Sequence, residues 1–153
     1  MKEKLKLILE NAIEEEEYFS RLYKELASLQ TNLLIKKKLL ELSNQEKMHK
    51  EKLESLDFVK LGAKVIPGVL DSIKINTDVS NTPKAEFYNI ELMFKFAITQ
   101  EALAKTSYKK LAEAFDDKSA KNLFLTLFKE EEMHEHLLIE QLNKFRSELN
   151  NEL

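Results

Sequence analysis

Hydrophobic side chains recur every three or four positions along four long segments of the chain. This spacing places them on one face of an α-helix, so each segment is predicted to form an amphipathic helix. The four predicted helices span residues 2–28, 32–57, 83–115 and 118–150. Short connections at 29–31 and 116–117 join the first helix to the second and the third to the fourth, which predicts two antiparallel helical hairpins.

The segment between the hairpins, residues 58–82, has a different composition. It contains both glycines and one of the two prolines, and it ends at Thr82, which with Pro83 favours the N-cap and first position of a helix. We expect one short helical turn near Val69–Ile73. Fully extended, the segment reaches about 80 Å, roughly twice the length of a predicted helix, so it can return along the whole bundle. Two hairpins joined by such a crossover form a ferritin-like four-helix bundle.

The composition favours an all-α protein with one core. The chain of 153 residues is 43% hydrophobic and 33% charged, with only two glycines and two prolines. This length suits one domain better than two. We therefore predict a single ferritin-like domain over residues 1–153, made of a hairpin at 2–57, the crossover at 58–82 and a hairpin at 83–150.

Charge and cysteine content exclude several classes of function. The formal net charge of −3 gives no field that would attract nucleic acid or an anionic membrane. No segment approaches the length of an apolar membrane span, and residues 1–10 lack a signal-peptide pattern, so we expect a cytoplasmic protein. The chain has no cysteine, so any metal must be held by carboxylate and imidazole groups.

A glutamate interrupts the apolar seam near the middle of each predicted helix. The four are Glu16, Glu46, Glu101 and Glu131. Buried carboxylates without partners would each cost roughly several kcal/mol, whereas two divalent cations balance a charge of −4. His49 and His134 each follow a seam glutamate by three positions, on the same helix face, so they can offer a nitrogen to the same centre.

The two hairpins also repeat each other at an offset of 85 residues. The positions that keep their residue type are Glu16/Glu101, Tyr23/Tyr108, Leu26/Leu111, Ala27/Ala112, Glu46/Glu131, Met48/Met133 and His49/His134. Two of the three histidines therefore fall at equivalent positions of what looks like a duplicated hairpin. We predict a two-metal site with pseudo-twofold symmetry and one Glu-His pair on each metal.

This pattern resembles the rubrerythrin-like members of the ferritin-like di-iron carboxylate proteins. Each half has a glutamate, a tyrosine seven residues later and an E-x-x-H, and the resemblance covers essentially the whole chain. It implies that Glu46 and Glu131 bridge two metal ions and that Glu16 and Glu101 are terminal ligands. It also implies that each of the two histidines ligates one metal.

Two tyrosines lie near the predicted ligands. Tyr23 and Tyr108 return to the ligand face after two helical turns, and the resemblance implies hydrogen bonds to the ligands, although core packing alone would explain their positions.

The chain departs from the family pattern in two ways. Ala104 stands where full-length rubrerythrins have an additional carboxylate, so the predicted site has six ligands. Without cysteine there is no rubredoxin centre in these residues, so a reductase would receive its electrons from a separate protein.

Other charged residues lie beside the predicted ligands. Most of the run Glu14–Glu17 is predicted to face solvent, with Glu17 as the main alternative to the ligand beside it. Glu130 and Glu132 are predicted to be exposed, because neither has the i+3 relation to the histidine of that helix. His136 lies about 200° around the helix from that histidine and is predicted to be a surface residue.

Three functions are compatible with this site. The first is a redox enzyme that reduces peroxide or dioxygen at a di-iron centre with electrons from an external donor protein. The second is iron oxidation, binding or storage as in ferritins, and the third is a helical interaction module with a structural metal. Iron suits oxygen-rich adjacent sites better than zinc, and manganese suits the same ligands. This fold commonly pairs bundles side by side, so we expect a homodimer or larger homo-oligomer.

Overall fold

A computed structural model of the chain describes residues 2–73 and 89–152. Four long helices dominate this part: α1 (Lys2–Ser28), α2 (Leu33–Glu54), α4 (Ile90–Glu113) and α5 (Lys118–Glu152). The crossover contains a short helix, α3 (Phe58–Gly62), and a 3₁₀ turn, η1 (Val69–Ser72).

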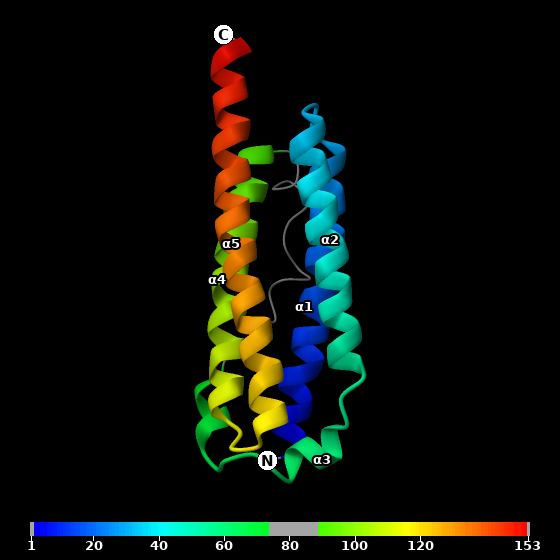
Figure 1. The fold of residues 1–153 in the computed structure, drawn as a ribbon, viewed down its shortest axis with the longest axis vertical. Coiled ribbons are helices and arrows are strands. Elements are labelled where there is room, and N and C mark those ends of the chain that lie inside the picture. The colour runs from blue at the N-terminus through cyan, green and yellow to red at the C-terminus, as the bar shows by residue number, and fades with distance from the viewer. Residues whose placement is uncertain (1, 74–88, 153) are drawn as a thin grey trace.

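The long helices pack as two hairpins (Figure 1). The helix α1 lies along α2 and α4 lies along α5, while the hairpins meet through α1 against α4 and α2 against α5. In this view α2 ends at the bottom of the bundle and α4 begins at its top, so the end of the first hairpin and the start of the second lie at opposite ends of the bundle. The predicted all-α, ferritin-like arrangement is confirmed.

The core lies along the predicted helix faces. Among its largest fully buried side chains are Phe19 and Tyr23 of the first hairpin and Phe94, Phe115 and Phe124 of the second. Phe115 stacks on Phe124 with ring centroids 5.6 Å apart, which closes the turn between α4 and α5. Because buried aromatic side chains contribute large apolar areas, they hold the four helices at a fixed separation.

The second helix is shorter than predicted. It begins after Asn32, whose side-chain oxygen accepts hydrogen bonds from the backbone N–H groups of Leu34 and Ile35 at 2.8 and 3.1 Å. It ends at Glu54, because Asp57 adopts an extended backbone conformation and caps α3. The prediction placed residues 58–62 in the crossover without a helix, so α3 was missed.

The third long helix begins later than predicted. Asn89 has an extended backbone, and its side-chain oxygen accepts a hydrogen bond from the N–H of Leu92 at 3.1 Å. It is therefore the N-cap of a helix that starts at Ile90. The predicted cap, Thr82 with Pro83, lies outside the described residues.

The described part of the crossover closes one end of the bundle. Val65 pairs with Phe115 in an isolated antiparallel bridge, and Val65, Leu70 and Ile73 are buried. Gly68 has a φ of 87°, a left-handed conformation that glycine adopts without steric cost. The chain turns there into η1, which lies where the short helical turn was predicted.

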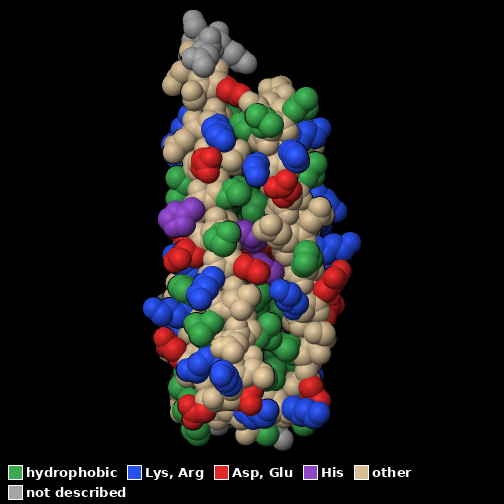
Figure 2. Space-filling view, in the orientation of Figure 1, with side chains coloured by type: hydrophobic (Ala, Val, Ile, Leu, Met, Phe, Trp, Pro, Cys, Tyr) green, Lys and Arg blue, Asp and Glu red, His purple; other side chains and the backbone are tan. Residues whose placement is uncertain are grey.

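The surface carries both signs of charge. Figure 2 shows Lys and Arg side chains mixed with Asp and Glu side chains along this face of the bundle, with hydrophobic side chains between them. Within the described residues, no helix is both long and apolar enough to cross a membrane.

Candidate metal centre

All six residues predicted as ligands meet in the interior of the bundle. Each long helix contributes at least one of them: Glu16 from α1, Glu46 and His49 from α2, Glu101 from α4, and Glu131 and His134 from α5. At most 3% of the surface of any of these residues is exposed, so water does not solvate their charges. The apolar seams therefore carry the four carboxylates into the core, as their spacing predicts.

The six residues form two groups that could each hold a metal ion. One group is Glu16, Glu46, His49 and Glu131, and the other is Glu46, Glu101, Glu131 and His134. The potential ligand atoms of each group lie within 4.8 Å of one another. Because Glu46 and Glu131 belong to both groups, these two clusters are suitable for a dinuclear metal site with shared carboxylates.

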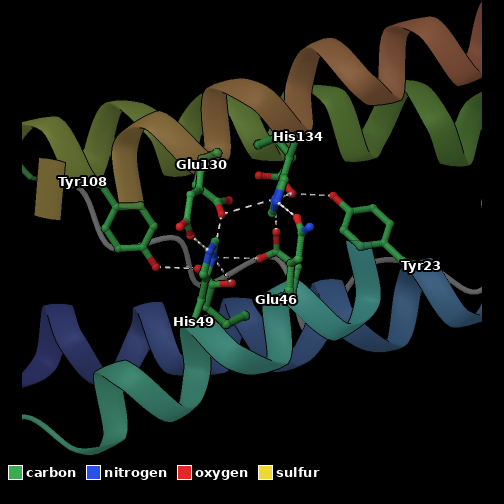
Figure 3. A network of polar contacts seen from close by, with 10 residues as sticks. Tyr23, Glu46, His49, Tyr108, Glu130 and His134 are labelled. Atoms are coloured by element: carbon green, nitrogen blue, oxygen red, sulfur yellow. Dashed lines mark hydrogen bonds and ion pairs between the residues drawn. The ribbon is translucent and has the colours of Figure 1, made fainter. Parts of the chain in front are cut away.

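Both imidazole rings turn Nδ1 toward the carboxylates (Figure 3). Nδ1 of His49 lies 2.8 Å from Glu131 Oε1 and 3.5 Å from Glu16 Oε2. Nδ1 of His134 lies 2.5 Å from Glu46 Oε1. The rings are nearly parallel, with centroids 5.5 Å apart. Each half of the repeat thus presents one imidazole nitrogen to the cluster.

Several carboxylate oxygens of the cluster have no hydrogen-bond donor in the protein. They are Oε2 of Glu16, Oε2 of Glu46, Oε2 of Glu101 and both oxygens of Glu131. Buried polar groups are nearly always hydrogen-bonded, and an unpaired buried carboxylate is costly. Cations between these oxygens would satisfy them. A donor set of four carboxylates and two imidazoles therefore fits a pair of metal ions.

Without cations, the carboxylates compete for protons. Burial raises the pKa values of Glu46 and Glu131 well above the usual range, and the neighbouring glutamates raise them further. Burial acts in the same direction on Glu101, but the close approach of Glu131 and His134 outweighs it and lowers that pKa. Like charges at short range separate pKa values in this way. Metal binding would therefore release protons from the centre.

The two predicted tyrosines hydrogen-bond across the hairpins. The hydroxyl of Tyr23 donates to Glu101 Oε1 at 2.5 Å, and that of Tyr108 donates to Glu16 Oε1 at 2.5 Å. Burial raises the pKa of both phenols, and the nearby carboxylates raise it further, so both stay protonated as donors. Both rings are also buried in the core, so packing and hydrogen bonding act together.

The outer nitrogens of the histidines have partners that the sequence pattern missed. Nε2 of His49 contacts the carboxylate of Glu130, and Nε2 of His134 contacts Oε1 of Gln45 at 2.6 Å. The prediction that Glu130 and Glu132 are exposed is wrong, because both are partly buried. A hydrogen-bond acceptor at Nε2 keeps the ring proton on that nitrogen. The lone pair of Nδ1 then faces the carboxylates and is free to bind a metal ion. The sequence signal that relates these two partners is the offset of 85 residues, which places Gln45 and Glu130 at equivalent positions of the repeat.

Glu17, the alternative to Glu16, lies outside the cluster. The ammonium group of Lys50 donates a hydrogen bond to Glu17 at 3.0 Å, and this bond lowers the pKa of Glu17. The helix α1 thus turns Glu16 toward the core and Glu17 toward a surface ion pair. His136 is exposed, as predicted.

Glu15 differs from the solvated side chain that was predicted. It is partly buried and lines a cavity of about 20 Å³ together with Ala104 and Tyr108, enough for about one water molecule. Burial raises the pKa of Glu15 to about 8, with the charge of Glu16 adding to the effect. The repeat indicates the reason for the space: Ala104 corresponds to the fully buried Phe19, so a large ring in one half is replaced by a methyl group in the other.

The chain matches the model of a known protein family. The family model described as Rubrerythrin matches residues 7–140, a range that contains all six clustered residues and both tyrosines. No curated protein and no solved structure matches the chain significantly.

Proposed function

Because the chain belongs to the rubrerythrin family, we propose that it is a redox enzyme that holds two iron ions in this centre and reduces peroxide or dioxygen there. The observation that carries the proposal is the pair of buried clusters that share Glu46 and Glu131. Four carboxylates carry a charge of −4, which two divalent ions balance when both imidazoles are neutral. Manganese suits the same donors, so the metal is identified by analysis of the loaded protein.

When bound, two ferrous ions supply the two electrons that convert one hydrogen peroxide and two protons into two water molecules. The protein supplies a dry surrounding for this chemistry. Leu42, Leu53, Leu127 and Leu138 lie one helical turn beyond the clustered residues and are buried. They limit the access of bulk water and so disfavour side reactions.

The tyrosines position Glu16 and Glu101, the two glutamates that each belong to only one cluster. Tyr23 and Tyr108 each donate to one oxygen of a glutamate from the other hairpin, Glu101 and Glu16 respectively. The second oxygen of each glutamate has no donor in the protein and is available to a cation. Each carboxylate is thus held from one side and open on the other.

The electrons would come from a separate protein. The sequence contains no cysteine, so these residues hold no thiolate-ligated electron-transfer centre. We propose that an external donor protein reduces the metal pair between turnovers. The face of the bundle shown in Figure 2 mixes both signs of charge, so this face gives no reason to prefer an acidic or a basic donor.

Anaerobic addition of hydrogen peroxide to the ferrous-loaded protein tests this function. We expect one peroxide to be consumed for every two ferrous ions oxidised, followed optically and with a peroxide assay. Glu17→Gln, beside the centre in the sequence but outside the cluster, should react like the wild type. Bound ferrous iron that does not react with peroxide would refute the redox function. Uptake of many more than two ions per chain would favour iron storage instead.

A further inference from the structure

The two histidines of the centre have outer partners of different charge. Nε2 of His49 contacts the Glu130 carboxylate, whereas Nε2 of His134 contacts the side-chain oxygen of Gln45 at 2.6 Å. Each partner comes from the other hairpin, and Figure 3 shows Glu130 reaching from its helix to His49. One imidazole therefore donates to a carboxylate and the other to a neutral amide.

The ligands and tyrosines around this difference are matched between the halves. Gln45 and Glu130 occupy the same position of the repeat, directly before the glutamate of each E-x-x-H. The clustered glutamates and histidines are the same in both halves, and both tyrosine hydrogen bonds measure 2.5 Å. The two metal positions thus have the same kinds of ligand. They differ in the charge of the side chain that contacts Nε2 of the ligating histidine.

A carboxylate behind an imidazole changes what the ring offers on its other nitrogen. Hydrogen bonds to a charged acceptor are roughly twice as strong as those between neutral groups. By attracting the Nε2 proton of His49, Glu130 increases the electron density and ligand strength of Nδ1. The partial burial of Glu130 reduces the screening of its charge by solvent and salt. Gln45 orients His134 without adding charge.

We infer that Glu130 makes the two metal positions unequal, so that a divalent transition-metal ion binds more tightly at the position of His49 than at that of His134. This inference rests on the proposed function only in requiring that the centre binds metal. Loss of an outer partner of a ligating histidine typically lowers metal affinity by about 10- to 100-fold, which sets the expected difference. The position at His49 should therefore fill first.

Titration of the full chain with Co²⁺ in a calorimeter measures both affinities. For the wild type we expect two binding steps whose dissociation constants differ by about 10-fold or more. Glu130→Gln gives both histidines an amide partner and should weaken the first step until the two merge. Gln45→Glu gives both histidines a carboxylate partner and should strengthen the second step.

The exchange variant that combines Glu130→Gln with Gln45→Glu is the matched control. It keeps the same two side chains and the same net charge, so it should restore two unequal steps in reversed order. The order is read from the paramagnetically shifted Nε2–H proton signals of the ligated imidazoles, assigned with His49→Gln. At one equivalent of Co²⁺, the wild type should show the signal of His49 and the exchange variant that of His134.

The experiment distinguishes unequal affinities that are not found from a centre that does not bind metal at all. Equal steps in the wild type, or a difference that persists unchanged in Glu130→Gln and in Gln45→Glu, would overturn the inference while the metal site stands. A wild type that binds no Co²⁺ would overturn the metal centre itself. Gln45 is exposed, so Gln45→Glu provides a test even if Glu130→Gln does not fold.

Discussion

Tyr108 in the second hairpin donates a hydrogen bond of 2.5 Å to Glu16 in the first. The equivalent residue in the first hairpin, Tyr23, donates to Glu101 in the second at the same distance. Both tyrosines and both glutamates are buried, so neither bond competes with bulk water. Each tyrosine therefore joins the hairpins at the level of the metal centre.

Replacement of Tyr108 by phenylalanine should destabilise the protein. The change keeps the ring in the core but leaves a buried oxygen of Glu16 without its donor. We expect the free energy of unfolding of the metal-free chain to fall by about 1.5–3 kcal/mol, as for other hydrogen bonds to charged groups. Urea unfolding measures this loss, and Tyr23→Phe should show a similar one. A change within about 0.5 kcal/mol for both, the range of ordinary surface substitutions, would contradict a structural role for these bonds.

Substitution of the shared glutamates should affect both metal ions, and substitution of the unshared ones only one. Glu46 and Glu131 belong to both clusters, whereas Glu16 and Glu101 each belong to one. We therefore expect Glu46→Gln to lower the metal content of the purified protein from about two ions per chain to nearly none, and Glu101→Gln to lower it to about one.

Elemental analysis after loading and dialysis measures this metal content. Glu17→Gln is the matched control, because Glu17 follows a clustered residue in α1 but pairs with Lys50 at the surface. An unchanged metal content in Glu46→Gln would show that the cluster is not the binding site.

The stability of the metal-free protein should fall as the pH rises, in part through Glu15. Its pKa is about 8 in the folded chain and about 4.5 otherwise. The folded state thus binds a proton between these values that the unfolded state has released, so its contribution to stability is full below pH 4.5 and is lost as the pH approaches 8. The slope is at most about 1.4 kcal/mol per pH unit for one such group.

Glu15→Gln should therefore flatten the dependence of the unfolding free energy on pH, with the variant more stable than the wild type near pH 8 and the difference smaller near pH 5. Denaturant unfolding at a series of pH values tests this. Glu46 and Glu131, whose pKa values are also raised, leave a residual slope of the same sign. Glu14→Gln, at the exposed neighbouring position, should keep the wild-type slope. Equal slopes for the two variants would contradict the burial of Glu15.

Asn32 should contribute to stability through two helices. It caps α2 and also donates a hydrogen bond to Glu148 of α5. Asn32→Ala should lower the free energy of unfolding by about 1–2 kcal/mol, measured by urea denaturation. Asn32→Ser keeps a capping oxygen and should recover most of this loss. If serine were as destabilising as alanine, the contact with Glu148 and not the cap would be the main contribution.

The hydrophobic pattern and the internal repeat predicted the main features of the protein. Long helices with a strong period of three to four residues are determined locally, so the ferritin-like fold was correct. A glutamate that interrupts an apolar seam lies on the same helix face as the seam, so it faces the core together with it. The six residues singled out on this basis lie together, and each is buried.

The features that were missed depend on the partner hairpin. Glu130 lies beside the seam of α5, and its carboxylate contacts His49 of α2 in the other hairpin. Glu15 is partly buried because a methyl group, Ala104, stands where a larger side chain would fill the space. The pattern within one helix contains no information about either contact. The short helix α3 was missed for a local reason, since its cap, Asp57, lay inside the predicted range of α2.

Neither hairpin forms a complete cluster alone. Each supplies three of the four residues of one cluster and receives the fourth, Glu131 or Glu46, from its partner. A single hairpin with this pattern would therefore bind metal only as a pair of identical copies, at a concentration high enough for them to associate. Joining both hairpins in one chain removes that dependence on concentration. It also allows the two halves to differ, and here one carries glutamine and the other glutamate before its E-x-x-H.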